Sequence, residues 1–106
     1  MNYSINKQAL MDKLGFDEED LVMLFSVFIK SSNENIDKLR EAIQTKDYNT
    51  IYICSHSLKG SSGNMMLNEV YTLSREIESA SKDSKDIDYM PYCNKIADVF
   101  NNLKLI

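Results

Sequence analysis

Apolar residues recur every three or four positions over most of the chain, which is the spacing of one face of an α-helix. The longest series consists of Leu21, Leu24, Phe25, Phe28, Ile36, Leu39 and Ile43. We expect it to form one helix from Asp17 to about Lys46, or two helices that meet at a bend near residues 31–33, where polar residues interrupt the series. Asp17 suits the N-cap because acidic side chains stabilise the first turn of a helix.

A short helix is predicted before this series and a longer one after it. The first runs from about Asn6 to Leu14 and ends at Gly15, which can adopt the left-handed conformation of a helix stop. We expect this short helix to pack on the others as an accessory. The longer one begins at Asp47, as its N-cap, and ends near Met65.

Two more helices follow. One begins near Asn68, and a polar loop over residues 81–86 separates it from the last, which starts after Asp88 and carries Pro91 in its first turn, where proline is tolerated. Their expected core residues are Val70, Leu73, Ile77 and Ala80, then Tyr92, Ile96, Val99, Phe100 and Leu103. Three glycines and one proline also fit an all-α protein. We therefore expect one domain over residues 1–106: an antiparallel four-helix bundle, its core at about 17–105, with a short accessory N-terminal helix.

Composition narrows the range of functions. The net charge of -4 and the pI near 4.9 argue against nucleic-acid binding, which uses basic surfaces. Cys54 and Cys93 match no zinc spacing and fall at helix core positions, so we expect reduced thiols in a cytoplasmic protein. No run approaches the roughly 20 apolar residues of a membrane span, and the polar first residues do not suggest a signal peptide.

The only histidine lies in the helix predicted from Asp47 to Met65. Helical spacing places it on one stripe with Tyr52, Lys59, Gly60 and Gly63. The opposite stripe carries Ile51, Cys54, Leu58 and Met65, with Ser61 and Ser62 near its edges. Since the second stripe is apolar enough to face a core, we expect His56 to point to solvent.

The residues beside His56 favour a reactive site. Each helical glycine costs roughly 1 kcal/mol relative to alanine, so Gly60 and Gly63 do not serve stability, but they leave room for another protein near the imidazole. Neutral imidazole is a nucleophile near pH 7, and Lys59 can meet phosphoryl oxygens. A lone histidine on a helix is more often structural or incidental. Here the lysine and the two glycines favour phosphoryl transfer through the histidine.

The run from His56 to Asn64, His-Ser-Leu-Lys-Gly-Ser-Ser-Gly-Asn, resembles the signature of histidine-containing phosphotransfer (HPt) domains. The resemblance extends from about Phe16 to Ser81. Further positions that fit the family are Leu39, Ala42, Asp47 and Tyr48 upstream, and Val70, Leu73, Ile77 and Glu78 downstream. One departure is Met66-Leu67, where relatives commonly have a small Gly-Ala pair at the turn into the next helix.

This resemblance implies a phosphocarrier and not an enzyme. His56 would accept a phosphoryl group from the aspartate of one receiver domain, in a response regulator or hybrid sensor kinase, and pass it to another. Lys59 would stabilise the phosphoryl group. Glu78 would either approach the histidine or lie on a solvated face. The expected receiver contacts are Tyr52, Ser55, Lys59, Gly60, Gly63 and Asn64, with apolar residues of the preceding helix.

The chain has no glycine-rich nucleotide loop and no carboxylate cluster with metal-binding spacing. We therefore expect no ATP site, cofactor or metal of its own, and any Mg²⁺ would belong to the receiver. The domain should be a monomer with no nucleic-acid or direct membrane contact. It is either free-standing or the cytoplasmic end of a membrane-bound hybrid kinase.

Two other functions fit a histidine on a helical bundle. The dimerisation and phosphoacceptor domain of a sensor kinase usually follows its histidine with an acidic residue and then a proline, whereas here Ser57 follows and the only proline is Pro91. A helical adaptor without phosphotransfer would use His56 only as a contact. A metal-binding bundle is the weakest alternative, because one histidine without matching carboxylates does not fill a site.

Overall fold

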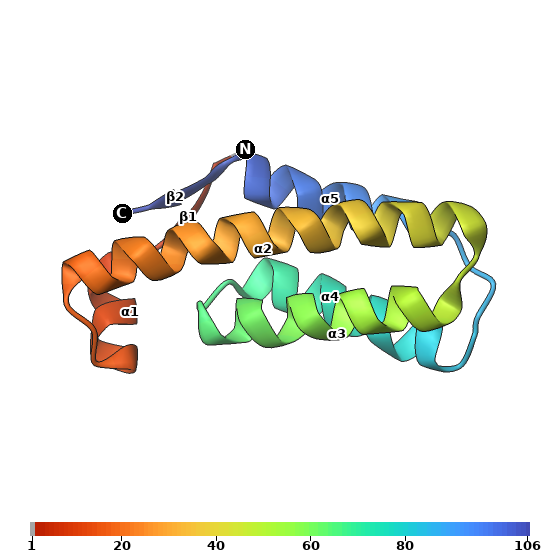
Figure 1. Ribbon diagram of the computed structural model, residues 1–106, viewed down its shortest axis with the longest axis horizontal. Coiled ribbons are helices and arrows are strands. Elements are labelled where there is room, and N and C mark those ends of the chain that lie inside the picture. The colour runs from red at the N-terminus through yellow and green to blue at the C-terminus, as the bar shows by residue number, and fades with distance from the viewer. Residues whose placement is uncertain (1) are drawn as a thin grey trace.

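Five helices and two short strands make up residues 2–106, which the computed structural model describes (Figure 1). In chain order they are β1 (Tyr3–Ile5), α1 (Lys7–Leu14), α2 (Glu18–Thr45), α3 (Tyr48–Asn64), α4 (Asn68–Lys82), α5 (Met90–Asn101) and β2 (Leu103–Leu105). The predicted helices are all present, with boundaries within two residues, and the largest differences are at the ends of α4 and α5.

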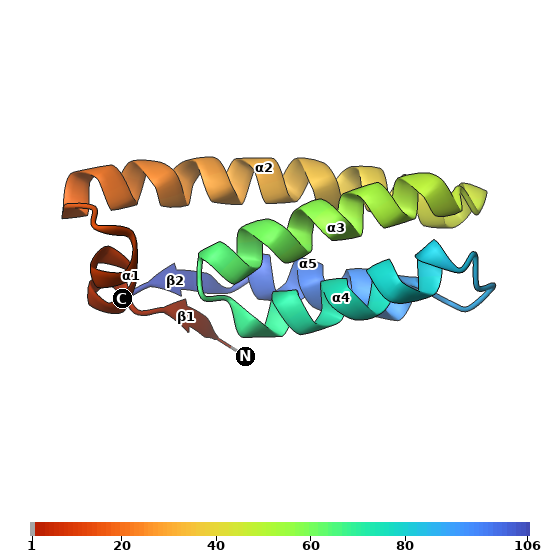
Figure 2. The ribbon, with the colours of Figure 1, turned by 90° about the horizontal axis from the view of Figure 1, so that it is seen from below.

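The four long helices close a bundle in which α2 packs on α3 and α5, and α4 packs on the same two helices. Successive helices run in opposite directions, and α1 crosses the end of the bundle where α2 begins (Figures 1 and 2). The molecule is 43 Å long, and the 28 residues of α2 span about that length at roughly 1.5 Å per residue. The all-α bundle expected from the sequence is confirmed.

α2 is one continuous helix, so the alternative of a bend near residues 31–33 is wrong. Ser32 is buried, and it continues the core-facing side of the helix between Phe28 and Ile36. The Asp17 side chain accepts a hydrogen bond from the backbone N–H of Asp20 at 2.9 Å, as an N-cap does. Lys46, with φ of 55°, ends the helix.

The core contains the apolar stripes that the sequence predicts. On α3, Ile51, Cys54 and Leu58 are at most 3% exposed, and Met65 just beyond its end is equally buried. The second cysteine, Cys93, is also buried, and burial raises the pKa of both thiols. Both cysteines are free, and as buried thiols they pack as small apolar residues.

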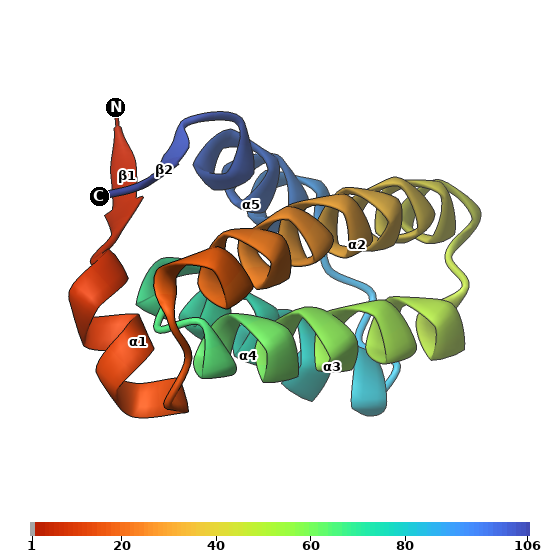
Figure 3. The same ribbon diagram turned by 60° about the vertical axis from the view of Figure 1, so that its left-hand side comes forward.

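The ends of the chain form a structure that the sequence pattern did not predict. β1 and β2 pair in parallel, with Tyr3 opposite Leu103 and Ile5 opposite Leu105 (Figure 3). Leu103 was expected in the last helix, but α5 ends at Asn101 and Leu103 lies in β2. Three-residue strands are too short to show an alternating pattern. Leu103 follows Val99 and Phe100 at helical spacing, so the sequence pattern assigns it to the last helix.

The loop predicted over residues 81–86 begins two residues later, because α4 continues to Lys82. Ser81 is buried, and its hydroxyl donates to the Ile77 carbonyl oxygen at 2.7 Å. A serine that bonds its own helix in this way satisfies its polar group without solvent. Because a polar residue at this position is typical of a loop, the sequence pattern puts the end of α4 two residues too early.

Met66, in the turn between α3 and α4, adopts a left-handed backbone with φ of 59°. Left-handed geometry costs a residue with a side chain roughly 1–2 kcal/mol, which glycine avoids.

Because the Met66 side chain is 44% exposed, Met66→Gly should raise the free energy of unfolding by about 0.5–1 kcal/mol, measured by urea denaturation. Met23→Gly, at a 65% exposed helical position, should lower it by about 1 kcal/mol. Equal losses in the two variants would contradict the strain at Met66.

Candidate functional site: an exposed histidine on α3

The start of α3 and its buried face fix the direction of His56. The Asp47 carboxylate accepts hydrogen bonds from the Thr50 N–H at 3.2 Å and the Thr50 hydroxyl at 2.6 Å, which hold the pKa of Asp47 below its usual value. Ile51 and Leu58 on the opposite side are buried in the core. The imidazole consequently faces solvent, with 62% of its side chain exposed, as the stripe analysis predicted.

Glu78 on α4 connects the histidine to the lysine one turn further along α3. His56 Nδ1 lies 2.8 Å from Glu78 Oε2, and Lys59 Nζ donates to Glu78 Oε1 at 2.9 Å. Glu78 is only 17% exposed and its carboxylate spans the gap between the two helices. The alternative that Glu78 lies on a solvated face is therefore wrong.

The environment of Glu78 keeps it ionised. Burial raises its pKa, but the hydrogen bonds from Lys59 and His56, together with the positive charge beside it, outweigh burial and hold the pKa below the ordinary 4.5. The stabilisation from this pairing is thus fully present above pH 4.5 and is lost as the pH falls through the lower folded-state pKa. The bond to Glu78 also raises the pKa of Lys59 above 10.5, so the lysine stays charged at neutral pH.

An ionised carboxylate only accepts hydrogen bonds, and this determines the tautomer of His56. Nδ1 must carry the proton that it shares with Glu78, and in the neutral ring Nε2 is then unprotonated. The free lone pair of His56 is therefore on Nε2.

Tyr52, one turn before His56, lies beside the imidazole. The two ring centroids are 6.0 Å apart and the ring planes differ by 19°, a stacked arrangement. Tyr52 is half-buried. Its predicted place on the outward stripe is confirmed, and it forms one wall of the site.

The two glycines of the stripe have different surroundings. A Cβ at Gly60 would meet nothing within 4 Å, so its surface is open. A Cβ at Gly63 would lie 3.3 Å from the Tyr71 ring of α4, closer than most packed side chains. The prediction that the missing side chain of Gly63 leaves room for a partner is wrong, because the Tyr71 ring occupies that space.

Ser55 does not lie on the surface predicted for partner binding. It is fully buried, and its hydroxyl donates to the Tyr52 carbonyl at 3.0 Å. Although it precedes His56 in the sequence, it is one turn from Ile51 and from Leu58, so it shares their buried face.

Asn64, the last residue of α3, is exposed as predicted. Its carbonyl and that of Gly63 accept hydrogen bonds from Lys13 Nζ of α1 at 3.2 and 3.1 Å. Lysine in this position satisfies carbonyls left free at the end of a helix. No pattern in the sequence indicated this contact of Lys13, which lies about 50 positions away in the chain.

Two further features bear on function. Residues 2–106 contain no group of three or more histidine, cysteine, aspartate or glutamate side chains placed to hold a metal ion. Over the same residues, the helices are too short or too polar for a membrane crossing.

Comparison with known proteins assigns the family. The family model for the Hpt domain matches residues 23–104, and the chain belongs to this family. Its role is histidine phosphotransfer in a phosphorelay, and such domains interact with receiver domains as phosphocarriers rather than catalysts.

The fold is also similar to a solved structure, the HPT domain from the Hpt sensor hybrid histidine kinase of Shewanella. The TM-score is 0.74 at 19% sequence identity, covering 92% of this chain and 87% of the other. Comparison with curated protein sequences gave no match. The family favours phosphotransfer over the sensor-kinase dimerisation domain and the adaptor that the sequence left open.

Proposed function

We propose that His56 is the phosphoacceptor, that it takes a phosphoryl group from the aspartate of one receiver domain, and that it yields the group to the aspartate of another. The observation that carries this proposal is the hydrogen bond between His56 Nδ1 and Glu78, which leaves Nε2 unprotonated on an imidazole that is 62% exposed. The chain offers no second histidine.

In the forward step, the Nε2 lone pair attacks phosphorus, the Nε2–P bond forms, and the P–O bond to the receiver's aspartate breaks. The aspartate leaves as a carboxylate with the bonding electron pair. Positive charge develops on the imidazole, whose Nδ1 keeps its proton, and the negative Glu78 stabilises that charge at 2.8 Å. The reverse step moves the phosphoryl group to the next aspartate.

Lys59 supports this step in two ways. It holds Glu78 through its 2.9 Å hydrogen bond, which positions the carboxylate for His56. Its ammonium also lies on the exposed stripe where phosphoryl oxygens arrive, and a mobile point charge suits them. Mg²⁺ would come with the receiver, and the domain would need neither ATP nor a cofactor of its own.

The receiver would dock over the open surface at Gly60 and the neighbouring apolar groove. This groove, about 450 Å³, lies where α1 and the first half of α2 meet the end of α3. Its lining includes Phe16, Val27, Ser61 and Asn64, and Val27 is 59% exposed. An exposed apolar surface beside a reactive group is typical of a protein contact. We expect a transient complex, with the domain itself a monomer in the cytoplasm.

The test is incubation of the domain with a receiver that carries labelled phosphate on its aspartate. Label should move to the domain as an acid-labile, base-stable phosphoramidate, and peptide mapping should place it on residue 56. Label that maps to a serine, or none at all with several receivers, would contradict the proposal. Sedimentation of the unmodified domain should give the mass of one chain.

Glu78→Ala should slow transfer roughly 10- to 100-fold while His56 remains the labelled residue, because the ring loses the group that orients it and fixes its tautomer. Nitrogen NMR of the imidazole should show the Nδ1 proton in the wild type and a mixture of tautomers in the variant. Glu78→Gln retains an accepting oxygen and should recover part of the rate. A wild-type rate and spectrum in Glu78→Ala would mean that Glu78 only stabilises the fold.

A further inference from the structure

The Ser74 hydroxyl on α4 is buried without a hydrogen-bond partner. In residues 2–106 it is the one fully buried side-chain polar atom with none. The other buried serines of α3 and α4 each donate to a carbonyl of their own helix; they are Ser55, Ser62 and Ser81. A buried hydroxyl that makes no hydrogen bond costs free energy that alanine would avoid. This hydroxyl therefore does not serve the stability of the unphosphorylated domain.

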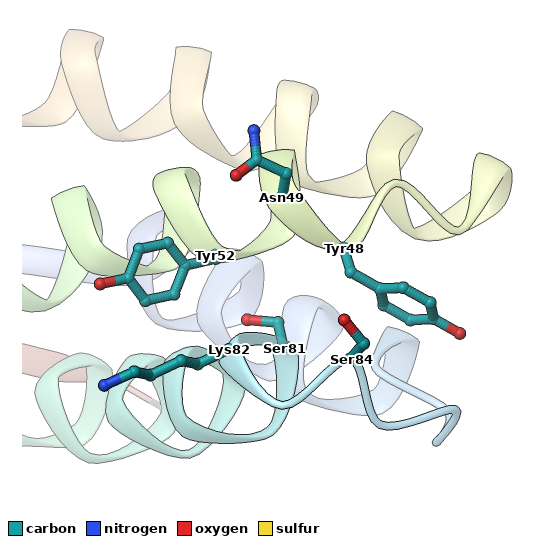
Figure 4. Close-up of a pocket in the computed structure, with 6 residues that line it drawn as sticks. All are labelled: Tyr48, Asn49, Tyr52, Ser81, Lys82 and Ser84. Carbon is teal, nitrogen blue, oxygen red and sulfur yellow. The ribbon is translucent and has the colours of Figure 1, made fainter.

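The side of α4 that carries Ser74 faces α3. The Tyr71 ring, three positions before Ser74, lies against Gly63 of α3. Glu78, four positions after Ser74, bonds two side chains of α3. In Figure 4, Ser81 on the following turn points from α4 toward α3. Residues three and four apart share one side of a helix, so Ser74 lies at the interface with α3, one turn from Glu78.

The position of Ser74 suits a hydrogen bond to Glu78. Side chains on a helix lean toward its N-terminus, so the Glu78 carboxylate lies over the turn that carries Ser74. A rotation about the Cα–Cβ bond moves the serine oxygen, and the hydroxyl hydrogen turns with little cost. The structure shows no such bond, because Glu78 Oε1 already accepts from Lys59 and Oε2 lies 2.8 Å from His56 Nδ1.

Phosphotransfer requires Lys59 in a different place. The phosphoryl group bonds Nε2, which is on the opposite side of the imidazole from Nδ1 and Glu78. Lys59 reaches the phosphoryl oxygens there only if its ammonium leaves Glu78 Oε1, the atom that it bonds at 2.9 Å. Since the carboxylate is 17% exposed, water replaces the lost bond only in part. Glu78 thus needs another donor at the moment when the imidazole becomes positively charged.

We propose that Ser74 supplies this donor. When Lys59 turns to the phosphoryl group, Ser74 Oγ donates to Glu78 Oε1 and keeps the carboxylate on His56 Nδ1. Ser74 is then a positioning residue, which acts on the histidine through Glu78 and touches neither the phosphoryl group nor the receiver. This inference rests on the proposed function, because the movement of Lys59 follows from phosphotransfer at His56.

The first test is nitrogen NMR of the imidazole in the unphosphorylated domain, with Lys59→Ala in place of the movement of Lys59. Ser74→Ala alone should keep the Nδ1 proton, because Lys59 still bonds Glu78. Lys59→Ala alone should also keep it, because the Ser74 hydroxyl takes over. The double variant should show a mixture of tautomers, a coupling that two independent structural roles would not produce.

The second test is transfer from a phosphorylated receiver over a range of receiver concentrations. Ser74→Ala should lower the maximal rate about three- to tenfold, the rate equivalent of one hydrogen bond. It should leave the half-saturating receiver concentration unchanged, because a buried side chain does not contact the partner. The urea midpoint should not fall, since the hydroxyl makes no bond in the unphosphorylated domain.

Ser81→Ala is the matched control. Ser81 is buried on the same helix, one turn beyond Glu78, and its hydroxyl donates to the Ile77 carbonyl oxygen at 2.7 Å. The variant should leave both kinetic values unchanged, and combined with Lys59→Ala it should keep the Nδ1 proton.

Equal rates and spectra for the Ser74 and Ser81 variants in both backgrounds would overturn this inference. A lower urea midpoint in Ser74→Ala would also overturn it, because the hydroxyl would then already be bonded before phosphorylation. Neither result affects the labelling of His56 in the wild type. Absence of that label would instead overturn the proposed function.

Discussion

Replacement of His56 by glutamine should abolish transfer of label from a phosphorylated receiver. Glutamine fits an exposed helical position and can still bond Glu78, but it has no nitrogen lone pair able to attack phosphorus. Since the side chain is 62% exposed, the melting temperature should stay close to that of the wild type, as is usual for surface substitutions. Phosphotransfer assayed by gel autoradiography, with circular dichroism for the fold, measures both effects.

Ser57→Ala provides the control for His56→Gln. Ser57 is exposed and adjacent to the histidine, and its hydroxyl accepts only a 3.3 Å hydrogen bond from Asn35. This variant should be labelled as fast as the wild type. Label that persists on His56→Gln and disappears in Ser57→Ala would assign the phosphoacceptor to the serine.

The largest loss of stability is expected from Leu58→Ala. Leu58 is 0% exposed, so its truncation removes buried methyl groups and leaves a cavity, at a cost of roughly 2–5 kcal/mol in the free energy of unfolding. Ile53→Ala, on the same helix but 55% exposed, should change stability by less than about 1 kcal/mol. Urea denaturation of the two variants compares the two faces of α3, and similar losses would contradict the orientation of this helix.

The sequence predicted the bundle because every long helix has one apolar side. On α3 that side fixed the outward direction of His56, and the prediction did not depend on any contact between helices. The N-caps Asp17 and Asp47 were predictable for the same reason, since a cap is a local hydrogen bond within four residues.

Features that depend on contacts between elements were only partly predictable. The spacing of α4 allowed Glu78 to face either His56 or solvent, and only the packing of α3 on α4 decides between them. Gly63 suggested an open surface because the sequence does not reveal that Tyr71 covers it. Ser55 is among the expected receiver contacts, although helical rotation turns its side chain into the core.

The pairing of β1 with β2 has a consequence for the order of folding. It joins segments from the two ends of the chain, and Lys7 N–H also donates to the Ile106 carbonyl. Closing so long a loop carries a large entropic penalty while the bundle is unfolded, and only a small one after the helices have brought the ends together. The two strands therefore form after the bundle has assembled, and they open first under mild destabilisation, while the helix that carries His56 keeps its position.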